Sequence, residues 1–89
     1  MQEMHIYVSG VVQGVGFRAV VKRHALLSEI KGYVRNLSDG RVEICAQGKR
    51  DQIDTFIHTV RLNPGRGVIS HIEAKSAPLQ ESFSTFEVL

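Results

Sequence analysis

The sequence predicts an α+β sandwich in which two helices cover one face of an antiparallel β-sheet. Three observations predict this class. Several runs alternate apolar and polar residues, as strands do, and two longer segments repeat their apolar residues at helical spacing. An Asp39-Gly40 pair separates two of the alternating runs, which is a strong hairpin signal. The elements follow in the order βαββαβ with a short extra C-terminal strand, which predicts a ferredoxin-like fold.

The composition is that of one globular domain spanning residues 1–89. The apolar share is 43% and the charged share is 22%, as in ordinary globular proteins. No apolar run approaches the ~18 residues of a membrane span, and the first residues lack the basic and apolar segments of a signal peptide. We therefore expect a cytoplasmic protein without a membrane partner.

The first strand is predicted at Met4 to Val12, because alternate residues are apolar. After a glycine-rich turn, a helix begins at Phe17. The apolar face of this helix is expected to contain Phe17, Val20, Val21, His24 and Leu27. We expect His24 to be a hydrogen-bonded histidine at the boundary of the core rather than a catalytic base.

A hairpin is predicted in the middle of the chain. Its strands are Ile30 to Leu37 and Arg41 to Gln47, joined by a Ser-Asp-Gly turn in which glycine adopts positive φ without steric cost. The core-facing residues of the second of these strands are expected to be Val42, Ile44 and Ala46. Those on the opposite, uncovered face are expected to be Arg41, Glu43, Cys45 and Gln47, so the thiol should be partly exposed and not a nucleophile.

The second helix is predicted at Asp51 to Leu62, with Asp51 capping or complementing its start. Its apolar positions are Ile53, Phe56, Ile57 and Val60. Pro64 ends the helix. A fourth strand is predicted at Val68 to Lys75 and a short edge strand at Phe83 to Val88.

The expected order of the first four strands in the sheet is 4-1-3-2. In that topology the first and second strands run in the same direction. The glycine-rich turn after the first strand and the polar residue that ends the second, Asn36, should therefore lie on one rim of the sheet.

The glycine-rich turn is a candidate phosphate site. Gly14 and Gly16 lie between a strand and a helix, where backbone N–H groups can converge on an anion. The residues expected to form this phosphate-binding loop are Gln13, Gly14, Val15, Gly16, Phe17 and Arg18.

Two motifs of the chain together resemble those of the acylphosphatase family. They are Gly10-Val-Val-Gln-Gly-Val-Gly-Phe-Arg18 and Gly32-Tyr-Val-Arg-Asn36-Leu-Ser-Asp-Gly40-Arg-Val-Glu43. The resemblance implies hydrolysis of the carboxyl-phosphate bond of acyl phosphates, with Arg18 binding phosphate and Asn36 positioning the attacking water. One departure is Glu29-Ile30, where the family usually has Gly-Leu.

The chemistry agrees with this resemblance. An acyl phosphate has a good leaving group, so catalysis needs positioning and charge stabilisation rather than a strong nucleophile. Arg18 can bind two phosphoryl oxygens, and the amide of Asn36 can hold a water without becoming charged. The phosphate of the substrate could accept the proton. No metal and no cofactor is expected, because no carboxylate cluster or His/Cys spacing indicates one.

The same residues also fit other interpretations. Gly14-x-Gly16-x-x-Ala19 fits a loose dinucleotide fingerprint, but the chain is too short for a Rossmann sheet. An RNA-binding sheet would carry aromatic residues on its third strand, which has none, so no nucleic-acid partner is expected. Similar modules also begin hydrogenase-maturation carbamoyltransferases. Asn36 could merely close the hairpin turn. We expect a monomeric enzyme acting on a small acyl phosphate.

Overall fold

All the predicted elements are present in the computed structural model, which describes all 89 residues. They are β1 (Gln2–Val11), α1 (Phe17–Leu27), β2 (Lys31–Asn36), β3 (Val42–Gly48), α2 (Arg50–Leu62), β4 (Val68–Ala77) and β5 (Phe86–Val88). The largest difference from the predicted bounds is at the last strand, and β1 and β4 each differ by two residues at one end. β4 continues to Ala77, and β5 begins only at Phe86.

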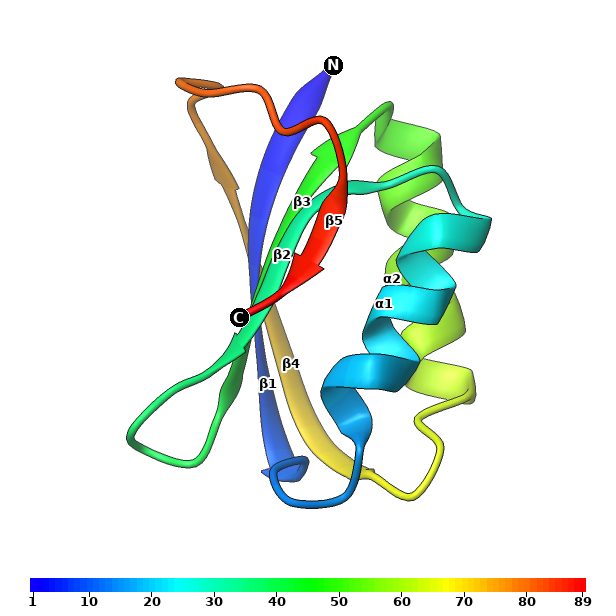
Figure 1. Cartoon of the computed structure of the whole chain (residues 1–89), viewed down its shortest axis with the longest axis vertical. Helices are drawn as coiled ribbons and strands as arrows, with labels where there is room; N and C mark the ends of the chain where they lie inside the picture. Colours follow the sequence, from blue (N-terminus) through cyan, green and yellow to red (C-terminus); the bar gives the residue numbers. More distant parts are fainter.

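The strands form one sheet in the order β4-β1-β3-β2-β5. The predicted order of the first four strands is confirmed, and all of their pairings are antiparallel. The prediction of a wholly antiparallel sheet is wrong at β5, which pairs with β2 in parallel. β4 ends at the end of the sheet where β2 begins. The chain then crosses this end of the sheet before it enters β5 (Figure 1). β5 therefore starts at the same end as β2 and runs in the same direction.

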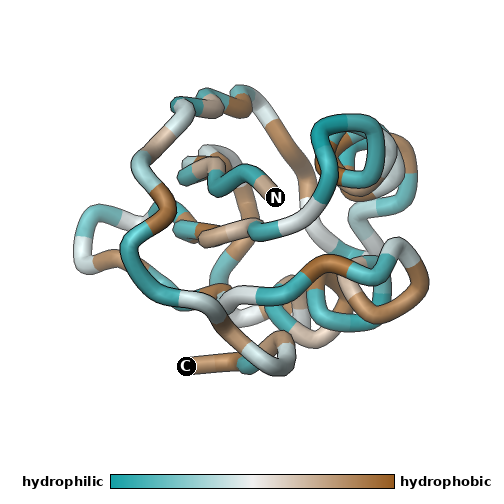
Figure 2. The backbone as a smooth tube through the Cα atoms, turned by 90° about the horizontal axis from the view of Figure 1, so that it is seen from above, coloured by the Kyte–Doolittle hydropathy of each residue, from teal (hydrophilic) through white to brown (hydrophobic).

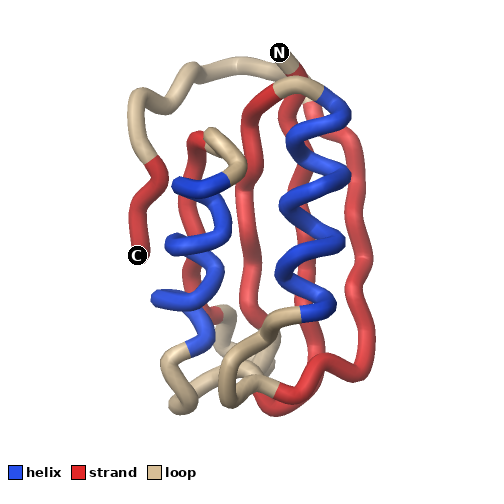
Figure 3. Tube along the Cα trace, turned by 90° about the vertical axis from the view of Figure 1, so that its right-hand side faces the viewer, coloured by secondary structure: helices blue, strands red, loops and turns tan.

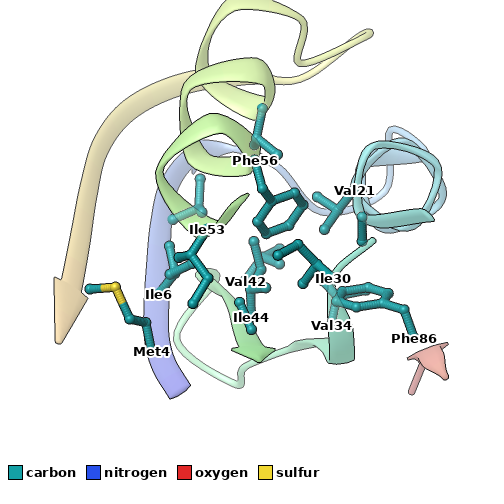
Figure 4. Close-up of a cluster of buried hydrophobic side chains, with 14 of the residues drawn as sticks. Met4, Ile6, Val21, Ile30, Val34, Val42, Ile44, Ile53, Phe56 and Phe86 are labelled. Carbon is teal, nitrogen blue, oxygen red and sulfur yellow. The ribbon is translucent and has the colours of Figure 1, made fainter. Parts of the chain in front are cut away.

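Both helices lie on one face of the sheet, as predicted (Figures 1 and 3). The core fills the space between these two layers, and Figure 4 shows side chains from the strands meeting those from the helices. The buried strand residues include Met4, Ile6 and Val8 on β1 and Val42, Ile44 and Ala46 on β3. From α2 come Ile53, Phe56 and Val60. These positions are the ones that the alternating and helical patterns predict.

One apolar position of α1 is predicted wrongly. Leu27 is 79% exposed, and Ala25 is buried instead. The helix ends at Leu27, and the next residues turn sharply, with Glu29 at φ 58° and the Ile30 N–H donating to the Ala25 carbonyl (2.8 Å). This turn brings Ile30, rather than Leu27, into the core.

The second face of the sheet, away from the helices, is also partly covered. The segment between β4 and β5 lies against it. Gln47 donates from Nε2 to the Glu81 carbonyl and accepts at Oε1 from the Phe83 N–H (3.0 Å), and the rings of Tyr33 and Phe83 meet edge to face. Cys45 is therefore only 1% exposed, and the prediction of a partly exposed thiol is wrong.

The start of α2 also differs in detail from its prediction. Lys49 occupies the N-cap position, and its N–H donates to Gln52 Oε1 (3.0 Å). Asp51 lies in the first turn, where its carboxylate accepts a hydrogen bond from the Gln52 N–H. Asp51 thus complements the helix N-terminus without capping it. Neither helix is long and apolar enough to span a lipid bilayer, and Figure 2 shows hydrophobic and hydrophilic residues interspersed along the chain.

Candidate functional site

The loop between β1 and α1 contains two glycines whose backbone lies in the left-handed region. Gly14 has φ 76° and Gly16 has φ 77°, a conformation that costs a residue with a Cβ roughly 1–2 kcal/mol. A Cβ at either position would meet nothing within 4 Å. The glycines are therefore needed for the path of the backbone, and the space beside them is free for a ligand.

The N-terminus of α1 is left open by its own sequence. Gly16 is the N-cap residue and provides no side-chain hydrogen bond, and no acidic residue lies in the first turn. The first N–H groups of a helix have no partners within the helix, and the helix dipole adds partial positive charge there. With neither cap nor acid to neutralise it, this end of α1 favours an anion.

Arg18 is held beside this helix end by the C-terminal segment. Its Nη1 donates to the backbone oxygen of Leu89 (2.6 Å), and the Leu89 N–H donates to the Val34 carbonyl on β2 (2.9 Å). A guanidinium carries five N–H donors, and the bond to Leu89 is the one hydrogen bond that the Arg18 guanidinium makes within the chain. The remaining donors are available to a ligand.

Asn36 is the last residue of β2, and its side chain is exposed. The hairpin turn that follows is closed by other groups. The Leu37 N–H donates to the Arg41 carbonyl (2.8 Å), and the Asp39 carboxylate accepts from the Arg41 N–H and Nε, which holds the pKa of Asp39 below its ordinary value. The Asn36 amide makes no hydrogen bond within the chain. The alternative in which it closes the turn is therefore not what the structure shows.

These elements meet at a cavity of about 220 Å³. It is lined by Val12, Gly14, Gly16, Phe17, Arg18, Ala19, Asn36 and Val88. The predicted common rim brings Arg18 and Asn36 to the same cavity, because β1 and β2 both pair antiparallel with β3 and so run the same way. Two residues of the predicted loop, Gln13 and Val15, do not line it.

Val15 and Gln13 have other contacts. Val15 packs against the hydrophobic core. The side chain of Gln13 crosses to the hairpin, where Nε2 donates to the carbonyls of Leu37 (2.8 Å) and Arg41 (2.9 Å). Both protons of the amide are thus used to join the glycine loop to the strand ends that flank the turn. Asn36 directly precedes Leu37, one of the two residues whose carbonyls accept these hydrogen bonds.

The contributions of Val88 and Leu89 were not predicted. Val88 lines the cavity, and Leu89 binds Arg18. No periodicity or motif places the end of the chain beside α1, because this contact depends on the path of the segment between β4 and β5. His24, in contrast, lies where it was predicted. It is buried at the boundary of the core, and its Nε2 is hydrogen-bonded to the Asn63 carbonyl (2.8 Å).

Comparison with known proteins shows which family has this fold and this loop. Residues 4–88 match the profile of the acylphosphatase family. A protein of Archaeoglobus fulgidus named acylphosphatase is 46% identical over 88 residues, which cover 99% of this chain and 98% of that protein. A protein of the same name from Chlorobaculum tepidum is 41% identical, with 99% and 96% covered. The chain belongs to the acylphosphatase family.

Solved structures agree with this assignment. The crystal structure of acylphosphatase from Bacillus subtilis superposes with a TM-score of 0.94 at 32% identity, covering 100% of this chain and 99% of that one. HypF from T. kodakarensis also matches the whole chain, with a TM-score of 0.90 and 37% identity, but only 12% of its own length is covered. The same fold therefore also forms a small part of a much longer protein.

Proposed function

We propose that this chain hydrolyses the carboxyl-phosphate bond of acyl phosphates, giving a carboxylate and inorganic phosphate. One observation carries the proposal. In a member of the acylphosphatase family, the uncapped end of α1, Arg18 and Asn36 all line one cavity. We infer that the whole chain acts as a single domain and as a monomer, since every group that the reaction needs comes from one copy, and that it works in the cytoplasm.

The phosphoryl group of the substrate would bind at the start of α1. The N–H groups of the loop from Gln13 to Arg18 can donate to its oxygens, helped by the partial charge of the helix end. Arg18 can add two parallel hydrogen bonds from one guanidinium edge. These donors are in place before the substrate arrives, so charge that develops on the phosphoryl oxygens is stabilised without reorganisation.

The attacking water would be held by Asn36. Its amide has a free acceptor and free donors at the cavity wall, so it can orient a water toward phosphorus without carrying charge. The carboxylate is a good leaving group, and the reaction mainly needs this positioning. The phosphate of the substrate can take the proton of the water.

This chemistry uses no metal ion. Among the side chains that line the cavity there is no carboxylate, imidazole or thiol, which are the usual side-chain ligands of metals in proteins. We therefore expect full activity in the presence of a chelator. No nucleic-acid partner is part of the proposal, since the groups at the cavity suit a small anion.

The test is hydrolysis of benzoyl phosphate with chelator present, comparing wild type with Arg18→Ala and Asn36→Ala. Arg18→Ala should lose both turnover and competitive inhibition by inorganic phosphate. Asn36→Ala should keep inhibition by phosphate while turnover falls ~10²-fold or more, because only a positioning group is removed. Arg23→Ala, an exposed position on α1 away from the cavity, is the matched control and should behave as wild type.

Two outcomes would contradict the proposal. If Arg18→Ala and Asn36→Ala both hydrolyse benzoyl phosphate at the rate of wild type, the roles given to them are wrong. If wild type is inert but still binds inorganic phosphate, the cavity is a non-catalytic anion site.

A further inference from the structure

A second cluster of reactive side chains lies on the face of the sheet away from the helices. Glu3 and His5 are two residues apart on β1, so their side chains point to the same face. Cys45 on β3 is the direct cross-strand partner of His5. The carboxylate, imidazole and thiol ligand atoms all lie within 4.8 Å of one another. Three different metal ligands are therefore gathered on two adjacent strands.

We propose that Glu3, His5 and Cys45 bind a divalent metal ion of the zinc type. The proposal is independent of the hydrolysis described above. Eight residues, the last six of β1 followed by Val12 and Gln13, separate His5 from Gly14, a distance of roughly 26 Å along an extended chain. The cluster also faces away from α1, which provides Arg18.

The geometry suits a tetrahedral ion with three protein ligands and one water. Bonds of about 2.3 Å to sulfur and about 2.1 Å to nitrogen or oxygen place tetrahedral ligand atoms about 3.6 Å apart. The His5 Nε2 and Glu3 Oε2 atoms are now 2.7 Å apart and hydrogen-bonded, so they need to separate slightly. The sulfur lies within 4.8 Å of both, so it needs to approach by at most about an ångström.

The charges around the sulfur favour a cation. The carboxylates of Glu3, Glu43 and Glu81 all lie close enough to act on the Cys45 sulfur with negative charge. The charge of Glu43 is paired with Arg35, which leaves Glu3 and Glu81 to attract a positive ion. A bound metal would replace the thiol proton, because a coordinating thiol is deprotonated.

The surroundings also hold the carboxylate in place. Gln47 Nε2 donates to Glu3 Oε1 (2.7 Å), and the same nitrogen donates to the Glu81 carbonyl. Hydrogen bonds of this kind fix the orientation of metal ligands. The side chain of His5 is 29% exposed, so an ion and its remaining water can reach the cluster from that side.

The sequence predicts no metal site, because neither the Glu-x-His pair nor the distant cysteine has a recognisable metal-binding spacing. The three ligands are brought together only by the register of β1 and β3. Glu3 and Cys45 lie on the same face of the sheet, the one that alternation leaves polar and that was expected to be uncovered. A site of this kind is visible only once the strands are paired.

The test is titration of the reduced, full chain with Co²⁺, followed by competition with Zn²⁺. Wild type should bind one Co²⁺ and show the ultraviolet charge-transfer absorption of a cobalt–thiolate bond, which Zn²⁺ abolishes. Cys45→Ser should lose this absorption, and His5→Gln should bind at least ~10-fold more weakly. His71→Gln, which changes an exposed histidine on β4, is the matched control and should bind as wild type.

The proposal is overturned if wild type shows no cobalt–thiolate absorption, or if His5→Gln binds Co²⁺ as tightly as wild type. Circular dichroism verifies the fold of each variant. His5 is partly exposed and outside the core, so His5→Gln should fold. This variant therefore tests the proposal even if Cys45→Ser does not fold.

Discussion

The two hydrogen bonds of Gln13 make the strongest test of how the candidate active site is held together. Gln13 Nε2 donates to the carbonyls of Leu37 and Arg41, and thereby joins the phosphate-binding loop to the hairpin that begins beside Asn36. Gln13→Glu keeps the size of the side chain but replaces the donor with a charged oxygen that faces two carbonyl oxygens. Both hydrogen bonds are lost, and the loop is pushed away from the hairpin.

The size of the effect follows from these contacts. Two hydrogen bonds at about 1 kcal/mol each correspond to a loss of about 2 kcal/mol in the free energy of unfolding. For a domain of this size, that loss lowers the melting temperature by roughly 8–16 °C. Turnover should fall even at temperatures where the variant is fully folded, because a shift of about 1 Å between loop and hairpin can cost ~10²-fold in turnover.

The assay combines thermal unfolding with benzoyl phosphate hydrolysis at a temperature where the variant is folded. Turnover of Gln13→Glu should fall at least ~10-fold, while inorganic phosphate still inhibits. Gln80→Glu, at an exposed position between β4 and β5, introduces the same charge elsewhere and should match wild type in turnover. A lower melting temperature with unchanged turnover would refute the idea that Gln13 positions Asn36.

Two further predictions concern stability. Glu29, two residues past the end of α1, lies in the left-handed region with φ 58°. Glu29→Gly should therefore raise the free energy of unfolding by about 1 kcal/mol; an unchanged or lower urea midpoint would contradict this. Burial alone would raise the pKa of Glu3, but hydrogen bonds from Gln47 and His5 and the charge of His5 outweigh it and leave this pKa lowered. The unfolded chain then binds protons more readily, so the stability that this carboxylate contributes is complete above its ordinary pKa and is lost as the pH falls through the lowered value. With a chelator present, the melting temperature of wild type should therefore fall more steeply below about pH 5 than that of Glu3→Gln; parallel curves would show that the carboxylate contributes nothing.

Most of the fold could be predicted because its signals are local. The alternation of Met4, Ile6 and Val8 identifies β1 and its buried face, and the spacing of Ile53 and Phe56 identifies α2. These patterns survive in the structure because each element buries one side against a single core. The directions of the first four strands then follow from their connections, which is why Asn36 could be placed on the same rim of the sheet as the glycine loop.

Apart from Leu27, which a local turn at the end of α1 leaves exposed, the predictions that the sequence missed concern contacts between distant segments. The exposure of Cys45 was misjudged because the chain around Phe83 covers that face, and nothing in its composition indicates where it lies. Leu89 reaches Arg18 for the same reason. In both places the distant segment contributes a backbone group, the Phe83 N–H or the Leu89 oxygen, which the residue type does not reveal.

β2 is the element through which these long-range contacts act on the candidate active site. It carries Asn36 at its end, and the Leu89 N–H binds the Val34 carbonyl in its middle. The Leu89 oxygen in turn binds Arg18. Arg18, proposed to bind phosphate, and Asn36, proposed to hold water, are therefore both attached to β2. Gln13 connects the loop to the chain just beyond that strand. The relative position of Arg18 and Asn36 thus depends on a parallel strand and a side-chain amide rather than on any direct contact between them, and a change that loosens β5 should impair turnover without touching a residue of the cavity.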